Sequence, residues 1–591
     1  MANIGVSDNT SVFQLKKWLG VNESPDGDTG LKMGEAAVMR NFRITRENHL
    51  QIRPGYGAVC TLAQGAPVRG MWHGFVGGKE HLLAACNGHL WDVSTETWES
   101  EDLGTLDDAP THFFGFDQKV YLLTGADYYV WDGSSPVCVV DGYAPMVVTA
   151  AEPAGGGTLL ERVNLLTGKR RARYSPDGEA TQFQLPETDI SEMLYVDGTD
   201  IAWTADLQAG KITFACAPPK GVNTLVFTWR KGVGERERVV NMRFSEFYNG
   251  AADTRVFLYG DDTNRAVYSD LDENGRPCAE YFPDMNEMAV DSQNTPITAM
   301  IRHYDRLVVY KTDGAYSTDY SPVTLENGAV TAGFYTVPVN REIGNAAPGQ
   351  VRLVRNSPLT LHGRAVYQWG LANSGTRDER NAKRISDRVE ATLGDFELTG
   401  CVTFDDEWQQ EFYVICRDRA VVYNYATDSW YCYTDFPVAC MVPVNRELYF
   451  GTTDGQLMHL SRTYRSSAGR PIDALWESGA MDFNADWRRK YSANIWVSVK
   501  PEGQARVSVT AQSNRKSDHA RKEISYNLTT FHSANFRHWS FSSNYKPQVQ
   551  RVRLKVKKFT YYKLIFESCS TSSTATVLGV DTQIRYTGNV K

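Results

Sequence analysis

The sequence lacks C-x-x-C and H-x-x-x-H pairs, although it contains ten cysteines and eleven histidines. Zinc sites usually depend on such spacings, so the sequence does not predict a metal-built active site. Several cysteines, such as Cys86 and Cys416, lie inside runs that are typical of strands. We expect the cysteines to be buried free thiols that pack as small hydrophobic side chains.

The chain also lacks any apolar run that approaches the roughly 18–20 residues needed to span a bilayer. Its first residues, MANIGVSDNTSVFQLKKW, do not follow the charged, apolar and small-residue order of a signal peptide. We therefore expect a soluble protein that is made in a cytoplasm and has no membrane segment. No heptad run is present, which argues against a coiled-coil stalk.

Sequence signatures of catalysis are equally scarce. There is no G-x-S-x-G and no glycine-rich phosphate loop that ends in Lys-Ser/Thr. The repeated S-x-D-x-G-x-T-W box of sialidases has a single imperfect echo, SPDGEATQF from Ser175. Acids that a glycosidase could use occur at 261–262 (DD) and 405–408 (DDEW), but adjacent acids in a turn point in different directions and are usually solvated. We expect no enzymatic activity and no cofactor.

The sequence is instead rich in residues that form strands and tight turns. It has 30 Tyr and 48 Gly in 591 residues, with 42% hydrophobic and 12% aromatic content. This composition favours strands over helices and is far from that of a disordered chain. A chain of this length exceeds one ordinary hydrophobic core. The sequence therefore predicts an all-β protein of several domains.

Hairpin-like segments recur along the chain. In each, an apolar strand leads through a turn rich in Gly, Asp, Asn or Thr to a second strand that contains an aromatic or large apolar residue. Such turn residues tolerate the positive φ that tight hairpins require. The six segments are KEHLLAACNGHLWDV, KVYLLTGADYYVWDG, RVFLYGDDTNRAVYSD, RLVVYKTDGAYSTD, EFYVICRDRAVVYNY and RELYFGTTDGQLMHL.

The spacing of these segments indicates the architecture. Neighbouring second strands lie 40, 48 and 35 residues apart in the three uninterrupted pairs, which is the period of β-propeller blades. A gap of 107 residues before Tyr423 leaves room for one more blade, with RAVYQWGLANSG near Tyr367 as its candidate hairpin. Seven blades is the predicted count, with six or eight open. An early strand such as HLQIRPGYGAV could pair with the last blade and close the ring.

Two further units interrupt or follow this series. A long gap before Tyr268 contains the short strand-like runs FQLPE, LYVDG, KITFACAPPKG and LVFTWRKG, which predict a small inserted β-sandwich. After about Arg470 the blade pattern stops, and a separate C-terminal β-sandwich is predicted. The expected domains are an N-terminal arm with a ring-closing strand (1–60), the propeller (61–149 and 241–470), the inserted sandwich (150–240) and the C-terminal sandwich (471–591).

Charge is divided unevenly between these parts. Residues 480–591 contain 19 Lys/Arg and 7 Asp/Glu, a net of +12, so the rest of this −8 chain carries −20. In QRVRLKVKKF, Val552, Leu554 and Val556 alternate with basic residues and should be buried on one face of a strand. The opposite face would carry Arg551, Arg553, Lys555 and Lys557. This basic face could contact phosphates, an acidic protein neighbour or only water.

One turn resembles part of a calcium-binding loop. The run DLDENG matches the first half of the D-x-D-x-N-G pattern through Asp270, Asp272 and Asn274. The twelfth position, where a bidentate Glu is expected, is Tyr281, although Glu280 is adjacent. A hairpin turn between strands explains the same residues, so the calcium loop is only a weak candidate.

The N-terminal region carries the most distinctive motifs. The stretch WLGVNESPDGDTGLKMGEAAVMRNFRITRENHLQIRPGYG contains an N-F motif and an R-P-G-Y turn. It resembles the opening of tailed-phage virion proteins known as stabilisation, tail-hub or tail-nozzle proteins. The motif residues are Asn41, Phe42, Arg53, Pro54, Gly55 and Tyr56. The V-D-G, I-T-F and A-P-P-K-G runs of the insert (196–221) and the stretch from Trp476 to Lys490 are also similar to phage tail proteins.

This resemblance implies a ring, often hexameric, that lies below the portal and adaptor of the virion, with DNA passing along its axis. Other tail proteins and tail fibres would be neighbours. A net-negative wall would repel phosphates and let DNA pass with little friction. Ring assembly would need interfaces that close under rotation, which the two sandwiches could supply. The alternative is a host-surface receptor binder, in which exposed Trp and Tyr stack on glycans.

Overall fold

A computed structural model describes residues 9–23, 30–250, 252–324, 330–370, 381–502, 504–514, 516–526 and 546–590. Within these ranges α-helix is limited to α1 (Glu237–Val240) and α2 (Glu390–Gly394), with single turns of 3-10 helix beside α2. Nearly all other regular structure is β-strand, so the all-β prediction is confirmed. No helix in the described residues is long and apolar enough to cross a membrane.

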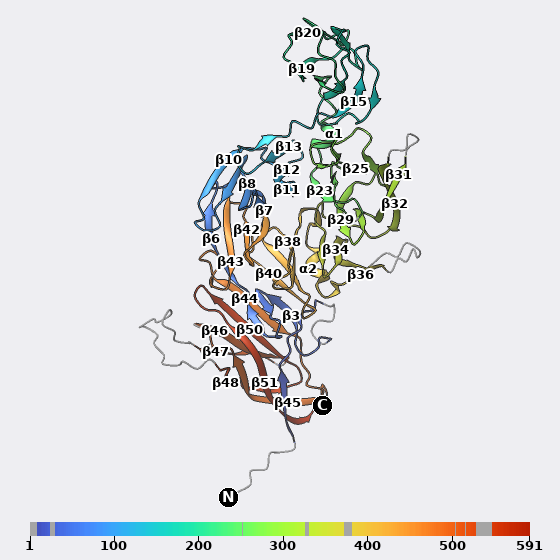
Figure 1. The fold of residues 1–591 in the computed structure, drawn as a ribbon. Coiled ribbons are helices and arrows are strands. Elements are labelled where there is room, and N and C mark those ends of the chain that lie inside the picture. The colour runs from blue at the N-terminus through green and yellow to red at the C-terminus, as the bar shows by residue number, and fades with distance from the viewer. Residues whose placement is uncertain are drawn as a thin grey trace.

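Seven four-stranded antiparallel units occupy the middle of the molecule (Figure 1). The first two are β7 (Val68–Val76), β8 (Lys79–Cys86), β9 (His89–Val93), β10 (Ser100–Thr105), and β11 (His112–Phe116), β12 (Lys119–Leu123), β13 (Tyr128–Trp131), β14 (Cys138–Val139). The next two are β23 (Phe244–Phe247), β24 (Val256–Tyr259), β25 (Arg265–Tyr268), β28 (Glu287–Ala289), and β29 (Ile297–His303), β30 (Arg306–Lys311), β31 (Ala315–Thr324), β32 (Val330–Asn340).

The remaining three units follow the same order. They are β33 (Arg352–Val354), β34 (Ser357–His362), β35 (Ala365–Trp369), β36 (Ala382–Arg384); β37 (Val402–Asp406), β38 (Glu411–Cys416), β39 (Arg419–Asn424), β40 (Ser429–Tyr433); and β41 (Cys440–Val444), β42 (Glu447–Gly451), β43 (Gln456–Ser461), β6 (Gly55–Thr61). The first strand of each unit contacts the next unit in chain order, and β41 of the seventh contacts β7 of the first. Each unit therefore contacts the next one, and the seventh unit contacts the first.

The hairpins read from the sequence correspond to real strand pairs. All six segments fold as adjacent antiparallel strands, namely β8–β9, β12–β13, β24–β25, β30–β31, β38–β39 and β42–β43. The candidate seventh hairpin, RAVYQWGLANSG, is described only in part: β35 pairs antiparallel with β34 before it and with β36 after it. The end of the segment, residues 371–375, lies outside the described residues.

The early strand HLQIRPGYGAV is divided into two. Its first part forms β5 (Leu50–Ile52), and its second part forms β6, which pairs antiparallel with β43 as the sequence predicts. The break falls at the Arg-Pro pair, because proline has no amide hydrogen for a strand ladder. The seventh unit thus takes three strands from near residue 450 and one from near residue 58.

The insert between β14 and β23 consists of two sheets that share a hydrophobic core around Phe183, Phe227 and Trp229. In Figure 1 it projects from the top of the molecule. A short link, residues 161–167, turns back into the neighbouring unit, where Leu165 and Leu166 join a different core. The two sheets are β16 (Thr158–Leu159), β15 (Met146–Ala151), β17 (Lys169–Tyr174), β22 (Leu225–Arg230), β19 (Glu192–Asp197), and β18 (Gln182–Gln184), β21 (Lys211–Phe214), β20 (Trp203–Asp206).

The C-terminal strands share both of their sheets with the N-terminal segment, so they do not form the separate unit that the sequence predicted. One sheet joins β1 (Thr10–Leu15), β4 (Phe42–Ile44) and β5 to β45 (Arg488–Val499), β48 (Gln548–Val552), β49 (Val556–Phe559) and β51 (Thr576–Asn589). The other joins β2 (Gly20–Val21) and β3 (Glu35–Arg40) to β44 (Ile472–Ser478), β50 (Tyr562–Ser570), β46 (Ala505–Ser513) and β47 (Lys516–Tyr526). Strand β3 also pairs with β40, which makes the second sheet continuous with the sixth unit.

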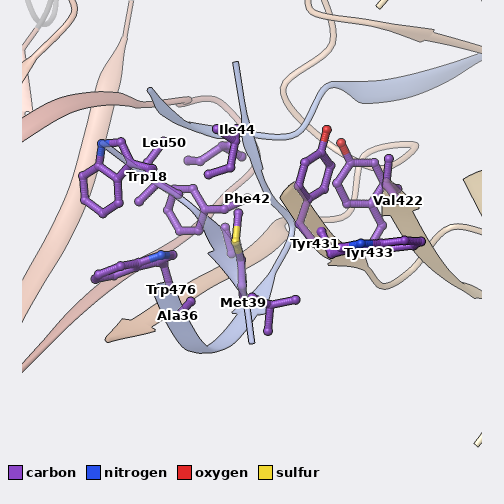
Figure 2. Packing of buried hydrophobic residues seen from close by; sticks show 14 of the residues in the cluster. Trp18, Ala36, Met39, Phe42, Ile44, Leu50, Val422, Tyr431, Tyr433 and Trp476 are labelled. Atoms are coloured by element: carbon purple, nitrogen blue, oxygen red, sulfur yellow. The ribbon is translucent and has the colours of Figure 1, made fainter. Parts of the chain in front are cut away.

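The reason for this sharing is the burial of the N-terminal aromatic residues. The indole rings of Trp18 and Trp476 meet edge to face with centroids 4.8 Å apart, and both side chains are fully buried. Figure 2 shows Phe42 between these two tryptophans and Tyr431 with its neighbours in β40. Strands β2 to β5 therefore pack between the C-terminal strands and the sixth unit.

The cysteines are all free, but only part of the burial expectation holds. Cys86, Cys401 and Cys416 are buried, whereas Cys138, Cys216 and Cys569 are exposed. Cys138 lies in the short edge strand β14 and Cys216 in a loop, whereas Cys569 lies near the end of β50, so a strand-like sequence run does not guarantee cover on both faces.

Candidate functional site

The two N-terminal motifs meet at a buried polar joint. Asn41 accepts at Oδ1 from Nε of Arg53 over 2.8 Å and from the amide of Thr434 over 2.9 Å. Its Nδ2 donates to Oγ1 of Thr434 and to the carbonyl of Asp473, each over 2.8 Å. The Asn41 side chain thereby links the N-terminal segment, the turn after β40 and the start of β44.

Arg53 completes this joint from the other side. Its guanidinium donates to Oγ of Ser467 over 2.8 Å, and to the carbonyls of Pro54 and Thr434 over 3.0 and 3.1 Å. The residue is 2% exposed and has no carboxylate partner within the described residues. Burial lowers the pKa of this guanidinium from its ordinary value, and the rings of Tyr56, Tyr433 and Phe436 surround it at 5.7–5.9 Å.

The other motif residues serve the same joint. Phe42 is fully buried in the core of Figure 2, and the hydroxyl of Tyr56 donates to the carbonyl of Asp435 over 2.8 Å. Gly55 lies so close to the neighbouring chain that an added Cβ would come within 2.5 Å of the Ser466 carbonyl oxygen. Pro54 ends the preceding strand. These residues are therefore a structural connection rather than an exposed recognition surface.

The carboxylates of the calcium-loop candidate, Asp270 and Asp272, are already bound to other groups of the chain. Asp270 pairs with Arg255 over 2.6 Å and accepts from Nδ2 of Asn286 over 3.0 Å. Oδ1 of Asp272 accepts from the backbone amides of Asn274 and Arg276 over 2.9 and 2.8 Å. These contacts stabilise the turn between β26 (Asp270–Leu271) and β27 (Pro277–Cys278). The described residues contain no group of three or more acids, histidines or cysteines arranged to hold a metal ion.

The predicted basic row lies at the edge of the N- and C-terminal sheet. Val552, Leu554 and Val556 are buried, and the four basic residues between and beside them, Arg551, Arg553, Lys555 and Lys557, are exposed. The alternation is as predicted, although the backbone is two strands, β48 and β49, with a break between them. Arg551 donates from Nε to Oδ1 of Asn494 over 3.1 Å.

Aromatic residues accompany this row across the sheet, which the sequence did not reveal. Tyr491 lies opposite Lys557, and Trp496 lies opposite Arg551, each on the neighbouring strand β45. Both aromatic side chains are half-buried. The signal was hidden because cross-strand partners are about 60 residues apart in the chain. The sequence shows only that polar and apolar residues alternate in NIWVSV, which predicts a strand but not its neighbour.

A cavity of about 690 Å³ opens between the fifth, sixth and seventh units. Its polar lining includes Asp405, Asp406 and Glu407, and Trp408 stands beside it with the Arg446 guanidinium 4.5 Å from its ring centre. The expectation that these acids are solvated is wrong for Asp406, which is 6% exposed. Its Oδ1 accepts from the amides of Trp408 and Gln409, so the turn holds the carboxylate inward.

Burial changes the titration of these acids. Desolvation raises the pKa of Asp405 to about 7 and that of Asp406 to about 6. On the first strands of the third and second units, burial raises the pKa of Glu246 to about 7 and lowers the pKa of His112 to about 4. His112 contacts Oγ of Ser245 through Nε2 over 2.9 Å. The first strands of the units therefore place several ionisable groups where water has limited access.

Comparisons with known proteins add little to this description. No protein-family model matches the chain, and no curated protein matches it. Among solved structures, the computationally designed Ika8 protein aligns over 68% of this chain and 99% of its own, with 9% identity and a TM-score of 0.32. The extracellular domain of a candidate one-component system from B. thetaiotaomicron aligns over 91% and 82%, with 10% identity and a TM-score of 0.26. TM-scores this low show neither a shared fold nor a shared function.

Proposed function

We propose that the protein is a structural component of a tailed-phage virion. It would form a ring in the tail or the head–tail connector, as a nozzle or hub through which DNA is retained and ejected. The observation that carries the proposal is the joint of Asn41 and Arg53. The residues that resemble the phage tail proteins are the ones on which the connection between both ends of the chain depends. The proposal assigns no catalytic step and no cofactor.

The proposed architecture is a seven-bladed β-propeller with an inserted β-sandwich and a β-sandwich built from both chain ends. Three features support it. There are seven four-stranded units in the described residues, the first strand of each contacts the next unit in chain order, and the seventh unit contacts the first. The last unit also takes its outer strand from the N-terminus, which is a way to fasten a propeller closed.

The distribution of charge supports a conduit. Residues 1–479 carry a net charge of −20, and a negative wall repels phosphates and keeps the friction of passing DNA low. The proposed partners are further copies of the chain, in a ring of about six, the portal or adaptor above, other tail proteins or fibres, and transiently the DNA itself. The protein would be made in the host cytoplasm and reside in the virion.

The test is the mass of the purified protein by light scattering, followed by negative-stain imaging of any assembly. A closed ring of about six copies with an open axis is the expected result. The imaging is repeated after addition of the portal and adaptor proteins, because the chain could assemble into a ring only when these neighbours are present. A particle that is monomeric in both conditions, or a compact trimer, would contradict the ring.

The cavity beside Trp408 favours a second candidate, a receptor-binding tail component that recognises host glycans. Trp408 is 54% exposed, and carboxylates that accept hydrogen bonds from sugar hydroxyls lie next to it. Binding to an array of bacterial surface glycans, lost in Trp408→Ala and retained in Trp487→Ala, would favour this candidate. Trp487 is a suitable control because it is similarly exposed, at 60%, and lies outside the cavity.

A further inference from the structure

Three neighbouring cations in the basic row have no partner among the residues that the structure describes. Arg553, Lys555 and Lys557 are exposed and form no ion pair or side-chain hydrogen bond within the described residues. Most arginines in the seven units are paired, as Arg69 is with Asp108 over 2.9 Å. An unpaired row of like charges repels itself, so it is an unfavourable arrangement unless something outside the chain neutralises it.

A group of acidic residues that has no ion-pair partner in the described part of the chain lies on the first unit. Residues 80–118 contain nine Asp/Glu and no Lys/Arg. Within this stretch Glu96, Glu99 and Glu101 are exposed and make no ion pair in the described part of the chain, whereas Asp92 and Asp102 contact histidines. The three glutamates line a hollow of about 610 Å³ at the turn between β9 and β10, together with Glu80, Asp92 and one cation, Lys79.

The two groups are complementary in sign and number. Glu96 lies in the turn before β10, Glu99 and Glu101 lie at its start, and Arg553, Lys555 and Lys557 alternate with buried residues from the end of β48 into β49. Each row also lies at a sheet edge. β10 pairs only with β9, and β48 and β49 pair only with β45, among the described strands. Long lysine and arginine side chains could enter the hollow beside the acidic edge.

We propose that Arg553, Lys555 and Lys557 of one copy of this chain dock on Glu96, Glu99 and Glu101 of a second copy. This inference rests on the proposed ring, for which it names the contact between neighbouring copies. Charged edges also discourage indiscriminate strand pairing. That role alone would not require two exposed groups of opposite sign and equal number.

A second copy fits the row better than nucleic acid does. Complementary carboxylates are already present at three positions of the same chain, so every copy brings its own partner surface. A conduit lined with unpaired cations would instead hold the passing DNA. Neutralisation by a neighbouring copy removes this cost, because it converts the basic row into part of the ring wall.

The test combines two charge reversals in the full-length protein. One variant carries Arg553→Glu, Lys555→Glu and Lys557→Glu, and the other carries Glu96→Lys, Glu99→Lys and Glu101→Lys. Self-association is measured by sedimentation velocity at low and high salt. Each variant alone should weaken association by at least about tenfold at low salt. The combined variant, which carries all six substitutions, should restore association because the two groups are again complementary in sign.

The control reverses three exposed cations elsewhere, Lys220→Glu, Arg341→Glu and Lys383→Glu, and has the same net charge as the basic-row variant. It should associate like the wild type. Circular dichroism melts check that every variant is folded. Association of the wild type should itself weaken as salt is raised, since ions screen exposed charges beyond about 8–10 Å.

The outcomes separate this inference from the proposed function. A wild-type ring that is insensitive to both reversals overturns the docking and leaves the ring intact. If each single reversal weakens self-association but the combined variant with all six substitutions does not restore it, these two groups do not pair with each other. A wild type that never self-associates, even with portal and adaptor proteins, overturns both proposals. If the basic-row reversal removes only retention on duplex DNA, the row binds nucleic acid and the docking is wrong.

Discussion

Nε of Arg53 donates a hydrogen bond to Oδ1 of Asn41 across 2.8 Å, inside the protein and out of reach of water. Asn41 adopts φ 54, in the left-handed region that asparagine tolerates better than most residues. Its amide can then face the guanidinium and the turn after β40 together. The pair fixes where the N-terminal segment leaves the C-terminal sheets and enters the seventh unit as β6.

Arg53→Met should destabilise the joint by about 3 kcal/mol or more. The substitution preserves much of the side-chain volume, but it leaves several buried oxygens without a donor, and each such group costs roughly 1–3 kcal/mol. These oxygens include those of Asn41, Thr434 and Ser467. Urea denaturation followed by tryptophan fluorescence would measure the loss, since Trp18 and Trp476 lie in the adjoining core.

The matched control is Arg40→Met. Arg40 also joins the N-terminal segment to β44, through Asp473 over 2.7 Å, but its side chain is 41% exposed. Exposed ion pairs contribute about 0–1 kcal/mol, so this variant should unfold almost like the wild type. Equal effects of the two substitutions would show that the Arg53 joint is not a special source of stability.

Gly55→Ala should prevent normal closure of the seventh unit. The added Cβ would lie 2.5 Å from the Ser466 carbonyl oxygen and 2.7 Å from that of Tyr464, so the start of β6 would have to move away from the segment that follows β43. We expect a lower melting temperature and faster proteolysis of the N-terminal segment. Gly400→Ala is the control, because nothing lies within 4 Å of its added Cβ. Equal melting temperatures for the Gly55→Ala and Gly400→Ala variants would show that the added Cβ at position 55 is not crowded.

The local part of the fold could be predicted from the sequence, because each hairpin has its own turn chemistry. Turn residues such as Asn445 and Arg446, with φ 51 and 69, sit between strands only a few residues apart. The pairing of β3 with β44 could not be predicted, since its partners are over 400 residues apart and nothing local specifies them. The separate C-terminal unit was the wrong prediction for that reason.

The same distinction applies to the candidate sites. The alternation around Leu554 was visible in the sequence, because burial of every second residue is a local property of a strand. The inward carboxylate of Asp406 was not visible, because its burial depends on the strands that surround the β37–β38 turn. The placement of Trp496 beside Arg551 likewise depends on strand register, which short motifs do not encode.

Asn164→Ala should loosen the insert without unfolding the seven units. The side chain is 2% exposed and donates to the carbonyls of Tyr143 and Glu280, each over 2.8 Å. It also accepts from the amides of Leu166 and Phe282. Losing these contacts should cost about 2 kcal/mol locally and increase hydrogen exchange in residues 161–167.

The control for this prediction is Asn264→Ala. Asn264 makes a comparable bond from Nδ2 to the carbonyl of Asp291 over 2.9 Å, but at the exposed surface. Water can replace that bond, so exchange should change little. Unchanged exchange at 161–167 in the Asn164 variant would mean that the apolar contacts of Leu165 and Leu166 alone hold the insert in place.

Stability should depend on pH through Asp405. Its pKa is raised by burial from 3.8 to about 7, so between these values the folded chain holds a proton that the unfolded chain releases. The contribution is fully present below about pH 4 and is lost as pH rises toward 7. Asp405→Asn removes this titration, so its melting temperature should fall less than that of the wild type between about pH 4.5 and 7.5. Calorimetry at stepped pH would measure the difference.

His112 should act in the opposite direction. Burial lowers its pKa from 6.5 to about 4, so in this interval the unfolded chain binds the extra proton and stability increases with pH. His112→Gln can keep a contact with Ser245 but cannot titrate, so the fall in melting temperature between about pH 4.5 and 6.5 should become steeper than in the wild type.

The control for both pH predictions is Asp132→Asn. Asp132 is an exposed acid whose pKa is lowered to about 2 by backbone amides, so it stays ionised throughout this range. Slopes that change in the same direction for the Asp405 and His112 variants would contradict the assigned protonation states.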